Sequence, residues 1–238
     1  MVRVAINGYG RIGRVAHRVI LLSHVDEVEV VAINAGSSTD ITGWMYLLKY
    51  DTVYGPLQNT ELAIKKAEET ALPFKSETKP IGAIVVNGKE IPVFSEKEPE
   101  KLPWKNLNVD VVIESTGHFA TQEGLQKHIT AGAKSAILSA PYKDEATGSV
   151  YVLGVNLAQI GNPASPVGRQ KIENLISNAS CTTNCITPIA HVIEQTFGIE
   201  KAMMTTIHGY TSDQRIQDGG HKDYRRARAA AENIIPTS

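Results

Sequence analysis

The stretch that decides the fold is NGYGRIGR, residues Asn7–Arg14, because it places three glycines in a G-x-G-x-x-G spacing. An apolar strand pattern, Arg3–Asn7, precedes it and an amphipathic helix pattern follows it. In this setting Gly8 makes the tight turn, Gly10 lets the backbone approach a pyrophosphate, and Gly13 lets helix and strand pack closely. The stretch therefore predicts a βαβ unit that binds a dinucleotide.

The start of the following helix supplies the rest of the expected phosphate site. Arg11 and Ile12 fall in its first turn, where unpaired N–H groups and the positive end of the helix dipole favour an anion. A glycine turn that binds nothing is the simpler interpretation of such a motif on its own. The flanking strand and helix favour the interpretation as a ligand site.

Strand and helix patterns alternate along the first two thirds of the chain. Strand patterns cover Val28–Asn34, Val109–Thr116, Ser135–Pro141 and Val150–Asn156, and helix patterns cover Asp40–Asp51 and Thr121–Ala133. Gly82–Ser95 is predicted to be a hairpin with Asn87-Gly88 as its turn, and Leu72–Pro80 and Gly161–Arg169 are predicted to be loops. This order predicts an α/β fold with a mainly parallel sheet.

The composition excludes several classes of protein. The chain has 238 residues, a formal net charge of -1 and 42% hydrophobic residues, which is typical of a soluble globular protein. It contains no apolar run of roughly 20 residues, and its N-terminus enters a strand pattern rather than a secretory leader. The two cysteines, Cys181 and Cys185, are too few for a disulfide scaffold. We therefore expect a cytoplasmic protein with reduced thiols, no membrane association and no metal centre.

The segment Ser177–Gly198 holds the candidate nucleophile. Cys181 follows residues that favour helix N-caps, and an apolar helical pattern begins beyond it, so we expect the thiol at a helix N-terminus. That position favours the thiolate. Cys185 lies one turn deeper and is the weaker candidate. His208, at the end of a predicted short strand Ala202–His208, is the candidate base. A buried structural cysteine and an unrelated histidine are the alternative.

Six motifs, in this order, carry a resemblance to a known family. They are INGYGRIGR (Ile6–Arg14), LLKYDTVYG (Leu47–Gly55), ESTGHF (Glu114–Phe119), SNASCTTNCITP (Ser177–Pro188), TTIHGYTSDQR (Thr205–Arg215) and HKDYRRARAAAENIIPTS (His221–Ser238). The chain resembles phosphorylating glyceraldehyde-3-phosphate dehydrogenase over nearly its whole length. The resemblance implies a Rossmann-type dinucleotide-binding domain at 1–179, followed by the start of an α+β catalytic domain at 180–238.

The resemblance also implies an activity of glycolysis. Cys181 attacks the aldehyde of glyceraldehyde 3-phosphate, His208 acts as general base, hydride passes to NAD(P), and inorganic phosphate releases 1,3-bisphosphoglycerate from a thioester. The implied phosphate-binding residues are Ser180, Thr182, Thr211, Asp213 and Arg225. The implied cofactor contacts are Gly8, Gly10, Arg11, Ile12, Gly13, Asn34, Ala35, Ser37, Ser38, Lys97, Thr116, Gly117 and Ser139.

Two departures from the family pattern concern the cofactor. Members that prefer NAD usually have Asn-Asp at the end of the second strand, where this chain has Asn34-Ala35, and often Leu-Pro where this chain has Gly219-Gly220. Loss of the carboxylate removes repulsion against a 2′-phosphate, and Ser37 and Ser38 offer hydroxyl donors. We therefore expect NADP to be accepted, alone or beside NAD. Neutral drift at position 35, with NAD bound through Asn34, is the alternative.

The end of the sequence and its basic run allow more than one interpretation. The sequence stops before segments that complete the catalytic domain in the family, which favours either a fragment or a non-catalytic, truncated nucleotide-binding homologue. Erythrose 4-phosphate is the alternative substrate. The basic run His221–Ala231 could suggest nucleic-acid binding, but in the family it lies beside the cofactor and a neighbouring subunit, so we expect a homotetramer and no nucleic acid. The segments 55–82 and 158–172 are longer than in most members.

Overall fold

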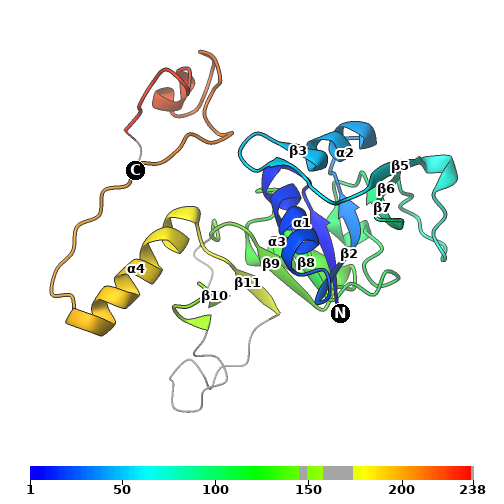
Figure 1. Cartoon of the computed structure of the whole chain (residues 1–238), viewed down its shortest axis with the longest axis horizontal. Coiled ribbons are helices and arrows are strands. Elements are labelled where there is room, and N and C mark those ends of the chain that lie inside the picture. The colour runs from blue at the N-terminus through cyan, green and yellow to red at the C-terminus, as the bar shows by residue number, and fades with distance from the viewer. Residues whose placement is uncertain (145–148, 158–173, 237–238) are drawn as a thin grey trace, which may run out of the picture. The chain divides into compact units, whose positions relative to one another are not determined.

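The computed structural model describes residues 1–144, 149–157 and 174–236 (Figure 1). The chain forms two compact units, Met1–Thr196 and Phe197–Ser238. The first unit is built on a large sheet, and the described part of the second contains a short 3₁₀ helix, η4 (Tyr224–Ala227). A domain boundary between residues 179 and 180 stays a prediction.

The described residues of the first unit form a nine-stranded sheet in the order β10-β11-β9-β8-β1-β2-β7-β6-β5. The strands are β1 (Val2–Asn7), β2 (Val28–Asn34), β5 (Leu62–Lys66), β6 (Gly82–Val86), β7 (Lys89–Phe94), β8 (Val111–Glu114), β9 (Ser135–Leu138), β10 (Ser149–Val150) and β11 (Leu175–Ser177). All neighbours from β10 to β7 pair in parallel, whereas β6 is antiparallel to β7 and β5. Because β7-β2-β1-β8-β9-β11 follows the order of doubly wound dinucleotide-binding folds, the predicted fold class is confirmed.

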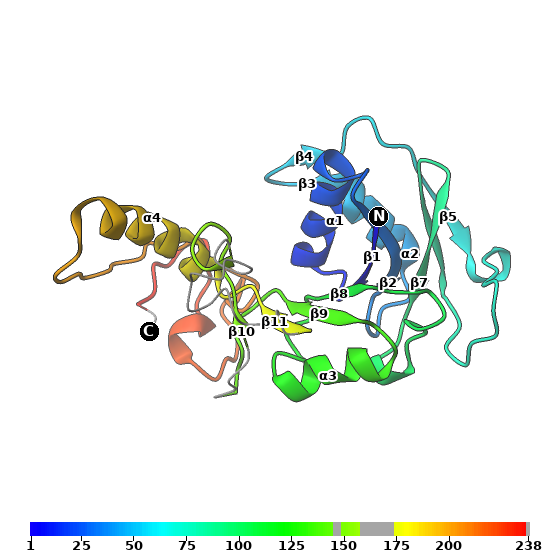
Figure 2. The same cartoon turned by 90° about the horizontal axis from the view of Figure 1, so that it is seen from below.

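Helices cover both faces of this sheet, with α1 and α2 on one face and α3 on the other (Figure 2). The helices are α1 (Arg11–Ser23), α2 (Ile41–Lys49), α3 (Gln122–Thr130) and α4 (Cys181–Phe197). Two of the helix starts follow directly from the sequence. Asp40 accepts a hydrogen bond from the backbone N–H of Gly43, and Thr121 accepts one from Gly124, so both helices have side-chain N-caps.

Each face of the sheet has its own apolar core. On the α3 face, Trp104 and Leu125 are fully buried, and the Trp104 ring meets Phe94 edge-on at a centroid distance of 6.4 Å. On the α1 and α2 face, Ile6 and Leu48 are fully buried. Burial of this apolar surface is the main stabilising term, and it fixes the carboxyl ends of the central strands where the glycine turn lies.

The predicted hairpin is confirmed. Asn87 and Gly88 both have positive φ, 48° and 81°, and Val86 pairs with Lys89 across the turn. Positive φ at both central residues is the requirement of a type I′ turn, which matches the twist of the flanking strands. The predicted loop at Leu72–Pro80 is also free of regular secondary structure.

The strand predicted at Val150–Asn156 is wrong for most of its length. The strand β10 ends at Val150, and a turn follows. The reason is the side chain of Asn156, whose Oδ1 accepts from the backbone N–H of Val152 at 2.8 Å and whose Nδ2 donates to the carbonyl of Val150 at 2.9 Å. These bonds satisfy backbone groups that a strand would have paired.

The strand predicted at Ala202–His208 is also wrong, since this segment has no regular secondary structure. Met203 is 102% exposed and Ile207 is 97% exposed. A strand needs a neighbouring strand for its backbone hydrogen bonds, and the described part of the second unit contains none. The loop predicted at Gly161–Arg169 lies outside the described residues.

Candidate functional site

The glycine turn between β1 and α1 has the geometry that a dinucleotide site requires. Gly8 has a φ of +92°, and a Cβ there would lie 2.6 Å from the backbone N of Thr116. A Cβ on Gly13 would lie 2.2 Å from the carbonyl oxygen of Gly8. Only glycine fits at these two positions, because α1 packs directly on the ends of β1 and β8.

The second glycine lies beside open space. A Cβ on Gly10 would meet no atom within 4 Å, and no side chain caps the N-terminus of α1. The first bond within the helix runs from the N–H of Arg14 to the carbonyl of Gly10 at 3.1 Å, so the preceding amides have no partner within the helix. Ile12, in this first turn, is 56% exposed. Open space beside unpaired amides fits a pyrophosphate.

Arg11, which the sequence also assigned to the cofactor site, is held by a carboxylate. Its guanidinium donates to both oxygens of Asp51, at 2.9 and 3.3 Å. The backbone N–H groups of Tyr54 and Val53 also donate to Asp51. The pKa of Asp51 is lowered, chiefly by the hydrogen bond from Tyr54 and then by the hydrogen bond from Val53 and the charge of Arg11. Together these effects outweigh desolvation, which would raise the pKa. This carboxylate therefore fixes Arg11 at the rim of the site.

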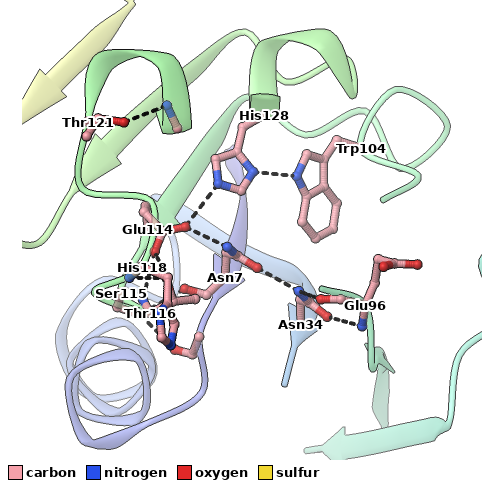
Figure 3. A network of polar contacts seen from close by, with 12 residues as sticks. Asn7, Asn34, Glu96, Trp104, Glu114, Ser115, Thr116, His118, Thr121 and His128 are labelled. Atoms are coloured by element: carbon pink, nitrogen blue, oxygen red, sulfur yellow. Dashed lines mark hydrogen bonds and ion pairs between the residues drawn. The ribbon is translucent and has the colours of Figure 1, made fainter. Parts of the chain in front are cut away.

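A buried polar network joins the carboxyl ends of three strands (Figure 3). Asn7 ends β1, Asn34 ends β2 and Glu114 ends β8. Asn34 Nδ2 donates to Asn7 Oδ1 at 2.7 Å, and Asn7 Nδ2 donates to Glu114 Oε2 at 2.5 Å. Asn34 also bonds the backbone of Glu96 twice, accepting its N–H and donating to its carbonyl. The amide of Asn34 is therefore committed to positioning the strand ends.

His128 also belongs to this network, and it comes from α3, on the face of the sheet opposite to α1 and α2. The Nε1–H of Trp104 donates to His128 Nδ1 at 3.1 Å, so this nitrogen is an acceptor and the neutral ring carries its hydrogen on Nε2. His128 Nε2 lies 3.1 Å from Glu114 Oε2 and donates to it. Burial alone would raise the pKa of Glu114, but hydrogen bonds from His128, Thr116 and Asn7 outweigh it and lower that pKa. Glu114 is thus a buried carboxylate held in its charged form.

Glu114 also holds the turn that follows β8. Its Oε1 accepts from both the backbone N–H and the hydroxyl of Thr116. Gly117 follows with a φ of +72°, and the N–H of Ser139 donates to the Glu114 carbonyl at 3.0 Å. Thr116, Gly117 and Ser139, all predicted cofactor contacts, therefore lie together at the carboxyl edge of the sheet. The sequence patterns did not indicate Glu114, His128 or Trp104, although a carboxylate at the end of an apolar strand is a usable signal.

The segment after β2 lies at the same edge. The N–H of Ala35 donates to the Phe94 carbonyl at 2.8 Å, and Ser95 Oγ donates to the Gly36 carbonyl at 3.0 Å. Ser37 is exposed and Ser38 is half-buried. Lys97, in the loop after β7, is exposed. This edge presents hydroxyl groups and a lysine, with no carboxylate at position 35.

Cys181 is the first residue of α4, as predicted. Ser180 is the N-cap, since its Oγ accepts from the backbone N–H of Thr183 at 3.0 Å. The preceding turn is fixed by Ala179, whose φ is +57°, and by the N–H of Asn178, which donates to the Leu138 carbonyl at 2.9 Å. The turn between β11 and α4 is therefore held against the end of β9.

Both cysteines are exposed and form no disulfide among the described residues, and the role of Cys181 as nucleophile stays a prediction. Thr182, the next residue of the helix, is half-buried. Ser180 uses its hydroxyl oxygen as a helix cap and also contacts the Thr183 hydroxyl at 2.8 Å. The thiol thus lies at a capped helix N-terminus, where unpaired amides stabilise negative charge.

The other predicted site residues lie in the second unit, where each contacts residues of that same unit. His208 Nδ1 lies 2.6 Å from the carbonyl of Gly209, so this nitrogen carries the ring hydrogen and donates it. Thr211 donates its N–H to Gln214 Oε1 at 3.0 Å. Asp213 pairs with Arg226 at 3.0 Å and lies 3.6 Å from His221 Nε2.

Arg225 pairs with Asp223 through two nitrogens, at 2.9 and 2.8 Å. This contact lowers the pKa of Asp223 to about 2. The predicted dinucleotide-site residues lie together in the first unit. Cys181 belongs to the first unit and His208 to the second, so a contact between thiol and imidazole stays a prediction.

Metal-binding clusters and membrane-spanning helices are both absent from the parts of the chain that the structure describes. No group of three or more His, Cys, Asp or Glu side chains there suits a metal ion. No helix there combines the length and apolar character that a membrane crossing needs.

The doubly wound sheet, the glycine turn and the exposed helix-terminal thiol define a dinucleotide-binding protein with a candidate nucleophile. Residues 2–122 match the family model for the glyceraldehyde 3-phosphate dehydrogenase NAD binding domain, and residues 180–238 match the model for the C-terminal domain of that enzyme. The chain belongs to the glyceraldehyde-3-phosphate dehydrogenase family, which confirms the resemblance.

Curated relatives extend this match over the whole chain. It is 50% identical over 237 residues to glyceraldehyde-3-phosphate dehydrogenase 2 of Streptomyces avermitilis, and 47% identical over 238 residues to glyceraldehyde-3-phosphate dehydrogenase 1 of Bacillus cereus. It is 46% identical over 237 residues to glyceraldehyde-3-phosphate dehydrogenase of Geobacillus stearothermophilus. Each comparison covers 100% of this chain and 62% of the relative, so the chain spans about 62% of the length of these proteins.

Proposed function

We propose that this chain is part of an enzyme that oxidises and phosphorylates glyceraldehyde 3-phosphate to 1,3-bisphosphoglycerate with NAD(P). The observation that carries the proposal is the exposed thiol of Cys181 at the first position of α4, capped by Ser180. The glycine turn of the same unit fits a dinucleotide, and the family match agrees with both features. The catalytic domain, in this proposal, begins at residue 180.

The proposed chemistry uses covalent catalysis. His208 takes the thiol proton of Cys181, the thiolate attacks the aldehyde carbon as the carbon–oxygen π bond breaks, and the oxygen takes that proton to give a thiohemiacetal. His208 takes the hydroxyl proton while the carbon loses a hydride, which leaves a thioester on Cys181. A nicotinamide, when bound, would supply the acceptor for this hydride. Inorganic phosphate then attacks the thioester carbon, the carbon–sulfur bond breaks, and the acyl phosphate leaves with the thiolate restored.

The phosphate groups are assigned to two sets of residues. Ser180 and Thr182 bind the attacking phosphate, and Thr211, Asp213 and Arg225 form the site for the phosphate of the substrate. Helix-terminal amides and hydroxyl groups bind phosphate without a metal ion, which supports the first assignment. A homotetramer in the cytoplasm completes the proposal. Light scattering on the natural protein tests the oligomeric state.

For the cofactor, we propose that NADP is accepted alone or beside NAD. Ala35 puts no carboxylate at the end of β2, while the exposed Ser37 and half-buried Ser38 follow it. Asn34, whose amide is committed to Asn7 and Glu96, positions this edge rather than replacing the missing carboxylate. The alternative substrate, erythrose 4-phosphate, is separated by comparing kcat/KM for the two aldehydes.

The thiol assignment is tested on the natural full-length protein by Cys181→Ser, with Cys185→Ser as the matched control. We expect Cys181→Ser to lose at least about 10³-fold in kcat while dinucleotide affinity stays unchanged, since the hydroxyl is a much weaker nucleophile. Cys185→Ser should retain most activity. Turnover that survives in Cys181→Ser would refute the assignment, and an inactive natural protein that binds the dinucleotide would favour the non-catalytic homologue.

A further inference from the structure

The turn that follows β8 contains one peptide group with no hydrogen-bond partner in the part of the chain that the structure describes. This group joins Thr116 to Gly117, and it comprises the carbonyl of Thr116 and the N–H of Gly117. Gly117 is exposed, has a φ of +72°, and would meet no atom within 4 Å if it carried a Cβ. The unpaired peptide therefore faces open space, where a ligand can replace the water that solvates it.

The peptide groups on either side of it are both fixed. On one side, the N–H of Thr116 donates to Glu114 Oε1 at 2.7 Å (Figure 3). On the other side, the N–H of His118 donates to Thr116 Oγ1 at 3.0 Å, and the carbonyl of Gly117 accepts from Lys143 Nζ. Because each peptide group is planar, fixing both neighbours sets the orientation of the unpaired group between them.

The backbone that carries Lys143 is itself anchored. The N–H of Lys143 donates to the carbonyl of Ala120 at 2.8 Å, at the end of the turn. A few residues earlier, the carbonyl of Ala140 accepts from Ser177 Oγ at 2.7 Å, which ties this segment to β11. Lys143 therefore reaches the turn from a segment that the sheet holds in place.

The turn needs such a contact because of the glycine at its centre. Glycine has positive and negative φ values of similar energy, so a peptide group next to it changes orientation at little cost. A charged donor binds a carbonyl more strongly than a neutral one. Without Lys143, the peptide that joins Gly117 to His118 would keep only the bond from its N–H to the Thr116 hydroxyl.

We propose that Lys143 is a positioning residue for the dinucleotide. Its ammonium group fixes the Gly117 carbonyl, so the carbonyl of Thr116 and the N–H of Gly117 are already oriented for the dinucleotide before it binds. This inference rests on the proposed function, which places a dinucleotide at this edge of the sheet. Since preorganisation lowers the cost of ordering on binding, Lys143 acts on dinucleotide affinity and not on the chemical steps.

The test is Lys143→Met in the natural full-length protein, because methionine nearly keeps the length of the side chain and removes its charge and donors. Titration calorimetry should show a dinucleotide Kd raised by about fivefold. The KM for the dinucleotide should rise by a similar factor while kcat changes by less than about twofold. In the free protein, amide hydrogen exchange of residues 115–120 should become faster. Lys143→Arg keeps a cationic donor and should restore most of the affinity.

Lys134→Met is the matched control, since the Lys134 ammonium also bonds an oxygen, Asp110 Oδ1 at 2.6 Å, just before β9. It should change neither dinucleotide affinity nor the exchange of residues 115–120. Unchanged affinity in Lys143→Met, weaker binding without faster exchange of the turn, or no rescue by Lys143→Arg would overturn the proposal.

The binding and exchange measurements separate this proposal from the proposed dehydrogenase activity. If the unmodified protein binds the dinucleotide but does not oxidise the aldehyde, the proposed activity fails, and the Kd and exchange of Lys143→Met still decide the role of Lys143. If the unmodified protein binds no dinucleotide, both proposals are overturned.

Discussion

Gly13 and Gly10 stand three residues apart, yet their surroundings predict opposite effects of the same substitution. A methyl group on Gly13 would lie 2.2 Å from the Gly8 carbonyl, so Gly13→Ala should lower the free energy of unfolding by about 2–3 kcal/mol. A methyl group on Gly10 meets nothing within 4 Å, so Gly10→Ala should change stability by less than about 0.5 kcal/mol. It should instead weaken dinucleotide binding, because it fills the space that the pyrophosphate needs.

Urea unfolding and dinucleotide titration of both variants measure these two effects. Equal losses of stability, or unchanged dinucleotide affinity in Gly10→Ala, would contradict the assignment of the second glycine to the ligand.

Ala35 carries the prediction about the cofactor. Ala35→Asp restores a carboxylate at the end of β2, where it would repel a 2′-phosphate and accept hydrogen bonds from a ribose hydroxyl. We expect the ratio of kcat/KM for NADP to that for NAD to fall by at least about tenfold. Ala35→Asn, with the same size and no charge, is the control and should change the ratio little. A strong NAD preference in the unmodified enzyme would contradict the premise.

At the scale of elements, Glu114 links β8 to the turn that the cofactor is expected to contact. The carboxylate accepts hydrogen bonds from Asn7, Thr116 and His128, so every neighbour is a donor. Glu114→Gln places an NH₂ group among these donors and should cost about 3 kcal/mol of stability. Glu123→Gln, at an exposed position of α3, should cost nearly nothing.

The same pair of variants tests whether the network positions the turn. We expect Glu114→Gln to weaken dinucleotide binding at temperatures where the variant is still folded, since the Thr116 hydroxyl and N–H lose an acceptor. A folded Glu114→Gln variant with unchanged dinucleotide affinity would show that the network is structural alone.

The elements that the sequence predicted correctly are those whose start or turn is determined by residues close together in the sequence. Asp40 caps α2 and Asn87-Gly88 makes the hairpin turn, and in both cases the decisive hydrogen bond or φ angle lies within a few residues. The strand predicted at Ala202–His208 failed because strand formation depends on a partner strand. The link between Asn7 and Glu114 spans 107 residues and could not be predicted from either segment alone.

At the scale of the whole molecule, the alternating patterns predicted the class of fold but not that β2 and β7 pair at only two positions, Ile33 with Val93 and Asn34 with Phe94. Right-handed crossovers from β1 and β8 to their neighbours explain why the strands take the doubly wound order. Periodicity carries no information on where two parallel strands separate. The segment around Leu72, singled out in the sequence for its length, has a structural role, because Leu72 packs against the apolar core on the α3 face of the sheet.

His17, which is fully buried in α1, makes the stability of the molecule depend on pH. Burial lowers the pKa of His17 from 6.5 to about 4, because the charged ring would lose its hydration. Between these two values the unfolded chain binds a proton that the folded chain does not. The contribution of His17 to stability is therefore constant above pH 6.5 and falls as the pH drops towards 4, by about 3 kcal/mol in all.

Glu114 acts in the same direction at lower pH. Its folded pKa lies below the ordinary value of 4.5, so its contribution is present above that value and is lost as the pH falls through the folded pKa. The two groups therefore affect stability over different ranges of pH. Of the two, His17 alone lowers stability between pH 6.5 and about 4.5, and Glu114 adds its effect below that range.

Urea unfolding of the unmodified protein and of His17→Phe between pH 7.5 and 4.5 distinguishes the contribution of this residue. We expect the free energy of unfolding to fall with pH more steeply in the unmodified protein, because the phenyl ring of the variant takes up no proton in either state. His24→Phe, the same substitution at an exposed position, is the matched control variant. Parallel slopes for His17→Phe and the unmodified protein would contradict this assignment, since they would show that the buried ring binds a proton as readily in the folded chain as in the unfolded one.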